Sequence, residues 1–402
     1  MPDGPVILFT GFEPSGDDHA SAVIAELRRR HPDLKMFAWG GPKMAAAGAE
    51  VVEETGQNAV MGLPGLGKIL EHRRINQRVA AWLNAHPTTV HVPVDSPAAN
   101  FPICAMAKAR GAKVVHLVAP QVWAWGKWRV HKLRRLTDFV CCLLPFEEDY
   151  FKQRNVPAKF VGHPLFDTRP DEQALAAQAE SFPQSGRRVA LMPGSRPSEI
   201  EKNFPLLIEA FRRLKKDYPD LSGVVAGTRP ELEEQFRGLA ERTPSAPGCE
   251  KGWPEGLAFT SRQTDAVIHW CELALVVSGT VTLQIAKQAR PMVIVYKSSR
   301  LMYWLLARWL LSTPFFSLPN LVAGERIVAE LIPHFGGPEP LVDEAVALLE
   351  RPELCERQRT RLREIGRMFE GRSAAVGAAD AIERVAGLAT RAEAAELIPA
   401  VG

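Results

Sequence analysis

The chain has 402 residues, of which 46% are hydrophobic and 24% charged, and its formal net charge is +3. This length exceeds the roughly 250 to 300 residues at which one hydrophobic core stops growing, so two domains are expected. The composition excludes long disordered stretches, and the small net charge gives no support to a nucleic-acid partner. The six cysteines form no CxxC pair and fall mostly in apolar runs, which is typical of reduced thiols in a cytoplasmic protein.

Short β-rich runs alternate with helical patterns along the chain, which predicts βαβ units and parallel sheets. The N-terminus has no basic stretch typical of a secretory signal, and residues 6–10 predict a first strand. The other expected strands are 35–39, 89–94 and 113–118 and, after a polar stretch at 171–187, 189–192, 222–226, 273–277 and 291–296. We therefore expect an α/β protein of two doubly wound, Rossmann-like domains joined near residue 170. From residue 341 onward the pattern is helical.

In doubly wound sheets, ligands bind outside the carboxyl ends of the strands, so the loops that follow strands are the first places to examine. Asp95 ends the strand at 89–94, and Pro97 prevents an immediate continuation as helix. A carboxylate there suits the base that takes a proton from an attacking hydroxyl in glycosyl transfer. The alternative is an N-cap for the next helix. In the loop at 11–20, Ser15 and Asp17 likewise stand where a helix cap or a substrate contact is expected.

A basic stretch at 127–135, preceded by tryptophans, suits an anionic and partly apolar ligand. Lys127 and Arg129 are the candidates to hold a phosphate in this stretch. A solvated helix face is one alternative, and stacking on single-stranded nucleic acid is another that nothing else in the sequence supports.

Two loops in the second half have the strand-to-helix setting in which backbone amides and a helix dipole bind phosphate. One contains Gly194, Ser195 and Arg196, where a plain glycine-serine turn is the alternative, and the other contains Ser278, Gly279 and Thr280, with Gln284 one turn inside its helix. Two such loops in one domain indicate a nucleotide diphosphate, whose leaving-group charge Arg196 would stabilise. Neither loop is a Walker loop, and no GxGxxG opens the first helix.

No HExxH or spaced Cys/His set occurs, so we expect neither a metal site nor a cofactor. Residues 301–319 are the most apolar later stretch, but Arg308 interrupts them, so a membrane span is not expected.

A series of motifs, taken in order between residues 15 and 324, resembles lipid-A-disaccharide synthases. The motifs are SGDDHA (15–20), GGPKMAAAG (40–48), VMGLPGL (60–66), VDSP (94–97), HLVAPQVWAW (116–125), LLPFEEDYF (143–151), VGHPLFD (161–167), LMPGSR (191–196), SGTVTLQ (278–284) and SLPNLVAG (317–324). Their order and spacing make a specific combination.

The resemblance implies a GT-B glycosyltransferase that moves 2,3-diacylglucosamine from UDP to 2,3-diacylglucosamine 1-phosphate, giving a β-1,6 disaccharide and UDP. It implies a peripheral enzyme on the inner face of the cytoplasmic membrane in a Gram-negative-type bacterium, with a homodimer possible. The expected domains are an acceptor and membrane side at 1–168, a UDP-sugar-binding domain at 169–338, and helices at 339–402 that pack on the N-terminal domain or a partner.

By position, the resemblance assigns Asp95 to the family's base and Glu13 and Ser15 to its N-terminal active-site loop. Arg196 and Asn320 fall on donor-side residues, and Gln284 stands where a glutamate usually faces the nucleotide ribose.

The sequence departs from the family pattern on the acceptor side. Phe12 and Pro14 replace a glycine and an alanine of the first loop, Gly65 replaces a glutamate, and Ala98 replaces a carboxylate. Two alternative functions therefore stay open, a UDP-sugar epimerase or hydrolase on the same scaffold and a non-catalytic UDP-sugar-binding protein.

The apolar stretches at 61–70 and 301–311 are membrane-surface candidates, although helices packed on their own sheet would show the same pattern.

Overall fold

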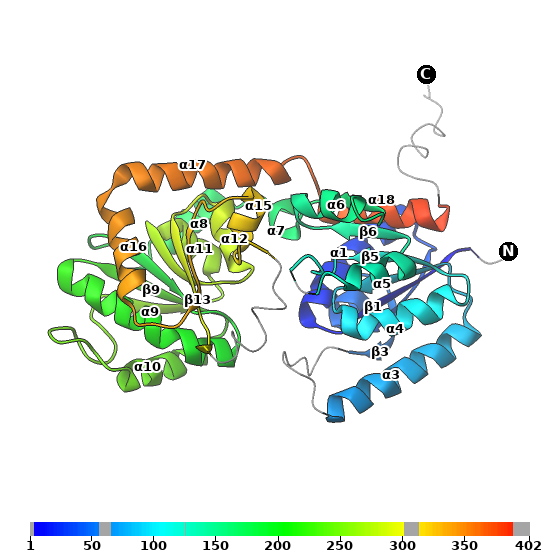
Figure 1. Cartoon of the computed structure of the whole chain (residues 1–402), viewed down its shortest axis with the longest axis horizontal. Coiled ribbons are helices and arrows are strands. Elements are labelled where there is room, and N and C mark those ends of the chain that lie inside the picture. The colour runs from blue at the N-terminus through cyan, green and yellow to red at the C-terminus, as the bar shows by residue number, and fades with distance from the viewer. Residues whose placement is uncertain (1–3, 56–65, 125, 301–312, 389–402) are drawn as a thin grey trace, which may run out of the picture. The chain divides into compact units, whose positions relative to one another are not determined.

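The computed structural model describes residues 4–55, 66–124, 126–300 and 313–388, with the side chains of 66–70 and 72 left out. The chain forms two compact units, one made of residues 1–167 and 371–402 and the other of residues 168–370 (Figure 1). Each unit contains a parallel sheet with helices packed on it, so the expected α/β class with two doubly wound domains is confirmed.

The first unit has seven parallel strands among its described residues, in the order β3-β2-β1-β4-β5-β6-β7. The order reverses between β1 and β4, and this switch point is where doubly wound sheets bind ligands. The strands are β1 (Val6–Gly11), β2 (Lys35–Gly40), β3 (Glu50–Glu54), β4 (Val90–Val94), β5 (Lys113–Leu117), β6 (Phe139–Cys142) and β7 (Ala158–Phe160).

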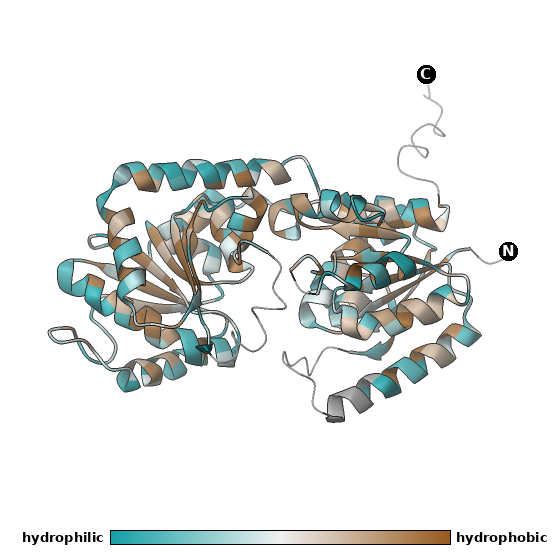
Figure 2. Ribbon diagram, in the orientation of Figure 1, coloured by the Kyte–Doolittle hydropathy of each residue, from teal (hydrophilic) through white to brown (hydrophobic). Residues whose placement is uncertain are grey.

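Alternation along β1 divides its side chains between two layers of helices, because successive strand residues point to opposite faces. Ile7 and Phe9 pack with α1 (Pro14–Arg30) and α18 (Ala374–Ala386), whereas Leu8 packs with α3 (Leu66–Ala85) and α4 (Pro97–Lys108). Figure 2 shows the resulting concentration of hydrophobic residues on the strands. The helices of this unit are α1 (Pro14–Arg30), α2 (Pro42–Ala46), α3 (Leu66–Ala85), α4 (Pro97–Lys108), α5 (Arg129–Leu136), α6 (Pro145–Lys152), α7 (Pro164–Asp167) and α18 (Ala374–Ala386).

The second unit has six parallel strands in its described part, in the order β10-β9-β8-β11-β12-β13. They are β8 (Arg188–Met192), β9 (Ser222–Gly227), β10 (Leu257–Ser261), β11 (Leu273–Val277), β12 (Met292–Lys297) and β13 (Ala329–His334). The helices are α8 (Glu172–Ala179), α9 (Pro197–Asp217), α10 (Leu232–Arg242), α11 (Thr264–Trp270), α12 (Val281–Lys287), α15 (Leu318–Ala323), α16 (Glu339–Glu350) and α17 (Pro352–Phe369). The switch point lies between β8 and β11, the two strands that precede the candidate phosphate loops.

The helices after residue 339 divide between the two units, which differs from the single group expected from the sequence. Helix α16 places Leu341 and Ala345 in the core of the second sheet, and α17 contacts α12. Helix α18 buries Ala378 and Ile382 in the core of the first unit, against the N-terminal sheet of its own chain. Helical periodicity shows that each helix has an apolar face but not which sheet covers it.

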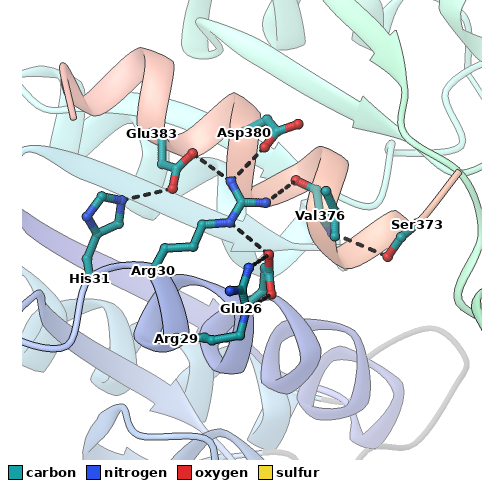
Figure 3. A network of polar contacts seen from close by, with 8 residues as sticks. All are labelled: Glu26, Arg29, Arg30, His31, Ser373, Val376, Asp380 and Glu383. Carbon is teal, nitrogen blue, oxygen red and sulfur yellow. Dashed lines mark hydrogen bonds and ion pairs between the residues drawn. The ribbon is translucent and has the colours of Figure 1, made fainter. Parts of the chain in front are cut away.

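Helix α18 is joined to α1 by a largely buried ion-pair network (Figure 3). The Arg30 guanidinium donates to Glu383 at 2.7 Å and to Asp380 at 2.6 Å, and His31 Nε2 lies 2.8 Å from the other oxygen of Glu383. The side chains of Arg30 and Glu383 are only 6% and 1% exposed. Removing one partner would leave the other charge buried and incompletely paired, which is strongly unfavourable.

We expect Arg30→Met to destabilise the attachment of α18 by about 3 kcal/mol, because Glu383 would lose its main counter-charge inside the protein. Hydrogen exchange of the α18 amides and the thermal unfolding midpoint measure the effect. The control is Arg29→Met, whose side chain is 61% exposed and pairs with Glu26, so both readouts should stay at wild-type values. Equal behaviour of the two variants would contradict the importance of this network.

Candidate active site

Asp95 follows β4 directly, and its backbone has an unusual conformation. Asp95 and the next residue, Ser96, have φ angles of 45° and 40°, and Val118, at the end of the neighbouring strand β5, has a φ of 65°. The Asp95 N–H donates to the carbonyl of Leu117 at 3.1 Å, which ties the two strand ends together. Positive φ in residues other than glycine is unfavourable, and such residues concentrate at functional sites.

The carboxyl group of Asp95 lies in surroundings that favour its neutral form. Burial raises the pKa of Asp95 above its usual value; the Ser96 N–H acts against this, and the nearby negative charge of Glu13 adds to it. Ser96 Oγ donates to Glu13 Oε1 at 2.7 Å, so the first loop and the Asp95 loop meet. A carboxylate with a raised pKa is a stronger base, as proton abstraction from a hydroxyl requires.

The buried side chain of Asn100 holds the Asp95 loop from inside helix α4. Its amide donates to the carbonyls of Asp95 at 2.8 Å and Val94 at 3.2 Å, and its oxygen accepts a hydrogen bond from Thr10 Oγ1 at 2.7 Å. The Asp95 backbone is therefore fixed by β5 on one side and by α4 and β1 on the other.

The first loop begins α1 earlier than the sequence suggested. Pro14 takes the first helical position, with Glu13 as N-cap, so Ser15 lies exposed in the first turn rather than at the cap. Asp17 is buried, and its carboxylate accepts from the N–H groups of Gly41, Lys43 and Met44 at 3.0 to 3.1 Å. Asp17 thus caps the separate helix α2, a contact that local sequence patterns do not reveal.

The sequence motifs do not mark Glu147 as a site residue, yet it lies close enough to Asp95 for their charges to interact. It is 3% exposed, and its carboxylate accepts from Trp123 Nε1 at 2.9 Å and from the N–H groups of Leu143 and Leu144 at 3.1 and 3.0 Å. Burial raises the pKa of Glu147 to about 7. A glutamate at the third position of a helix that follows Leu-Pro is a capping signal. The sequence around Glu147 gives no other local indication of its role.

The basic stretch forms helix α5 and the turn before it. Val130, Leu133 and Leu136 face inward, whereas Lys127 is exposed in the loop after β5. Arg129 is half-buried, and burial lowers the pKa of its guanidinium. Lys127 therefore stands at the same strand-end edge as Asp95, while much of the remaining helix presents a solvated basic face.

The loop after β8 brings Gly194, Ser195 and Arg196 to the N-terminus of α9, a helix of 21 residues. Gly194 has a φ of 95°, and a Cβ there would lie 3.1 Å from Glu199 Oε2. The half-exposed Arg196 guanidinium is held by Glu199 at 2.7 Å. Tyr296 lies beside this pair, and burial raises the pKa of its hydroxyl. Partial positive charge at the helix end and the guanidinium together suit an anionic group.

The second candidate loop, at Ser278, Gly279 and Thr280, follows β11, the strand paired with β8. Gly279 and Thr280 are exposed, and the space around Gly279 is open. Gln284 is half-buried, and its amide donates to Asp265 at 2.9 Å. A Cβ on Gly194 would stand 3.8 Å from Val277, so the structure brings the two loops together at one edge of the sheet.

Asn320 has a different place from the one expected for a donor-binding residue. It is fully buried, and its amide donates to Val328 O at 3.1 Å and to Glu330 at 2.9 Å. Its oxygen accepts from the N–H groups of Ile327 and Val328 at 2.8 and 3.0 Å. These four bonds use the whole hydrogen-bonding capacity of the side chain, so Asn320 orders the loop before β13 instead of offering a free group to a ligand.

Gly65 and Trp125 lie outside the described residues, as do the apolar stretch at 301–311 and part of that at 61–70. In the part of the chain that the structure describes, no three His, Cys, Asp or Glu side chains are grouped closely enough to hold a metal ion. Within the same ranges, no helix has both the length and the apolar character needed to cross a bilayer.

Comparison with known proteins identifies the family. Residues 7–375 match the family model described as lipid-A-disaccharide synthetase. The chain belongs to the lipid-A-disaccharide synthetase family. A lipid-A-disaccharide synthase of Aeromonas hydrophila subsp. hydrophila is 35% identical over 353 residues, which cover 87% of this chain and 91% of the relative. The resemblance seen in the sequence motifs is therefore confirmed, and the chain is a glycosyltransferase of this family.

Solved structures with much lower identity share the fold. An S. aureus MnaA structure with UDP has a TM-score of 0.63 at 10% identity and covers 95% of this chain and 97% of its own. A UDP-GlcNAc 2-epimerase from Neisseria meningitidis has a TM-score of 0.59 at 13% identity, with 94% and 98% covered. The expected GT-B architecture is confirmed, whereas similarity at this level carries no information on the reaction.

Proposed function

We propose that this member of the family transfers 2,3-diacylglucosamine from UDP to the 6-hydroxyl of 2,3-diacylglucosamine 1-phosphate, with Asp95 as the base. The observation that carries the proposal is the half-buried carboxyl of Asp95, held in a left-handed conformation at the switch point of the first sheet. The family match supports the formation of a lipid A disaccharide, and the identity of the acylated donor and acceptor is our inference from it.

In this mechanism, Asp95 removes the proton of the acceptor hydroxyl as its oxygen forms a bond to the anomeric carbon of the donor. The bond from that carbon to the UDP oxygen breaks at the same time, so the configuration inverts and UDP leaves with the electron pair. Glu13 assists by raising the pKa of Asp95 and by holding Ser96 in place. Ser15, exposed on the same loop, is the candidate to contact the sugar.

The developing charge on the diphosphate is stabilised by the end of α9 and by Arg196. The backbone amides around Gly194 and Ser195 contribute to this cradle, and the loop Ser278, Gly279 and Thr280 lies beside it. Gln284 would contact the nucleotide from the first turns of α12. Lys127 and Arg129 are the candidates for the acceptor phosphate, since they lie where the loop after β5, the strand next to β4, leads into helix α5.

Acylated substrates require access to a membrane surface, so we propose peripheral association with the inner face of the cytoplasmic membrane of a Gram-negative-type bacterium. We also propose that the protein forms a homodimer.

The replacement at Ala98, exposed in the first turn of α4, would change acceptor contacts near Asp95 without removing the base. The family match favours transfer over both the epimerase or hydrolase alternative and the non-catalytic alternative.

Asp95→Ala should abolish transfer while UDP affinity stays close to wild type, because the base is lost but the candidate diphosphate loops are intact. In the wild-type enzyme, kcat/KM should fall as the pH decreases through the raised pKa of Asp95, since the base acts only when ionised. Steady-state kinetics and UDP titration measure both effects. Turnover at the wild-type rate in Asp95→Ala would remove this residue from the role.

Arg196→Ala should weaken UDP binding by about 1.5 to 3 kcal/mol, the usual contribution of a hydrogen bond to a charged group. Calorimetric titration with UDP measures the loss. The matched control is Arg237→Ala, which removes an arginine paired with Glu233 on the exposed surface of α10 in the same unit. If both variants bind UDP like the wild-type protein, Arg196 does not contact the diphosphate.

A further inference from the structure

The loop after β5 is held in place by contacts from helix α6. Trp123 is 6% exposed, its indole N–H donates to Glu147 at 2.9 Å, and its ring meets that of Phe146 edge-on at 5.0 Å between centroids. Both contacts come from the first turn of α6. The loop begins at Val118, whose φ of 65° is unfavourable for a β-branched residue and therefore needs such support.

Glu147 makes more contacts than a helix cap requires. Capping is complete when one carboxylate oxygen accepts from the N–H groups of Leu143 and Leu144. The second oxygen accepts from Trp123, which connects α6 to the loop after β5. All three partners are N–H donors, and the two oxygens of a carboxylate accept them more strongly than those of a protonated acid, whose O–H also needs an acceptor of its own.

The same loop is connected to the candidate base. Leu117, the residue before Val118, accepts the hydrogen bond from the N–H of Asp95. The charged and titratable groups that interact with Glu147 include Asp95 and the Cys142 thiol, and Glu13 acts on Asp95 in turn. Burial is the main reason why the pKa of Glu147 is raised to about 7, its hydrogen bonds oppose the shift, and the negative charge of Asp95 adds to it.

We propose that Glu147 and Trp123 are positioning residues: together they hold the loop after β5, and through Leu117 they keep Asp95 in its reactive left-handed conformation. This inference rests on the proposed role of Asp95 as the base. Ionised Glu147 keeps all three N–H groups satisfied, so the positioning weakens as the pH decreases through the range in which Glu147 becomes protonated.

The first test is Trp123→Phe, which deletes the indole N–H and keeps an aromatic ring against Phe146. We expect kcat to fall between about tenfold and a hundredfold, as small displacements of a catalytic group do, with UDP affinity unchanged. The matched control is Trp270→Phe in the second unit, which deletes a buried indole N–H that donates to Pro183 O at 2.9 Å. This control should lose comparable stability and keep its kcat.

The second test is Glu147→Gln, which resembles the protonated acid in shape and charge. The wild-type pH profile of kcat should show an inflection near pH 7, with lower activity on the acidic side, and the variant should have a reduced kcat and lack this inflection. Glu148→Gln is the control on the same helix, because Glu148 is partly exposed and instead pairs with Lys152 and accepts from Phe160 N–H. It should keep the wild-type profile.

Wild-type kcat in Trp123→Phe, or an unchanged profile in Glu147→Gln, would overturn the positioning role. Asp95→Ala, assayed in the same series, distinguishes failure of the positioning role from failure of the base assignment. If Asp95→Ala is inactive while Trp123→Phe is fully active, the positioning role fails and the base assignment stands. If Asp95→Ala is active, the proposed function fails and the positioning role fails with it.

Discussion

The hydrogen bond from the Asp95 N–H to the carbonyl of Leu117 is the contact on which the account of this site depends. It extends the pairing of β4 with β5 by one residue beyond the strand and holds a carboxylate at the sheet edge with a positive φ, which is uncommon in residues other than glycine. Asn100 secures the same residue from α4, and Glu13 contacts its neighbour Ser96 from the first loop. The unfavourable backbone conformation persists because three separate elements support it.

The two units place their candidate site residues in the same way, at the point where the strand order of the sheet reverses, but these residues suit different tasks. In each sheet the strand order reverses at one point, and the loops beside that point carry the candidate chemistry. In the first unit the loop at this point presents Asp95, a carboxylate with a raised pKa, which suits proton removal. In the second it presents the N-terminus of a long helix together with Arg196, which suits a diphosphate.

The sequence predicted the strand-to-helix alternation, both sheets and the position of Asp95, because these depend on local periodicity and on the proline two residues later. It did not predict the roles of Asp17 and Asn320, since each caps or orders a segment that is distant along the chain or irregular in structure. Glu147 was missed for the same reason: its decisive partner, Trp123, lies 24 residues earlier. The division of the last helices between two sheets also depends on tertiary packing rather than on pattern.

The most direct test of the central claim is UDP release from UDP-2,3-diacylglucosamine in detergent, measured with and without 2,3-diacylglucosamine 1-phosphate. We expect UDP to appear only when the acceptor is present, in step with formation of the disaccharide. Release at the same rate without acceptor would indicate hydrolysis or another reaction of the donor alone. Binding of the donor with no release under either condition would contradict catalysis by this chain.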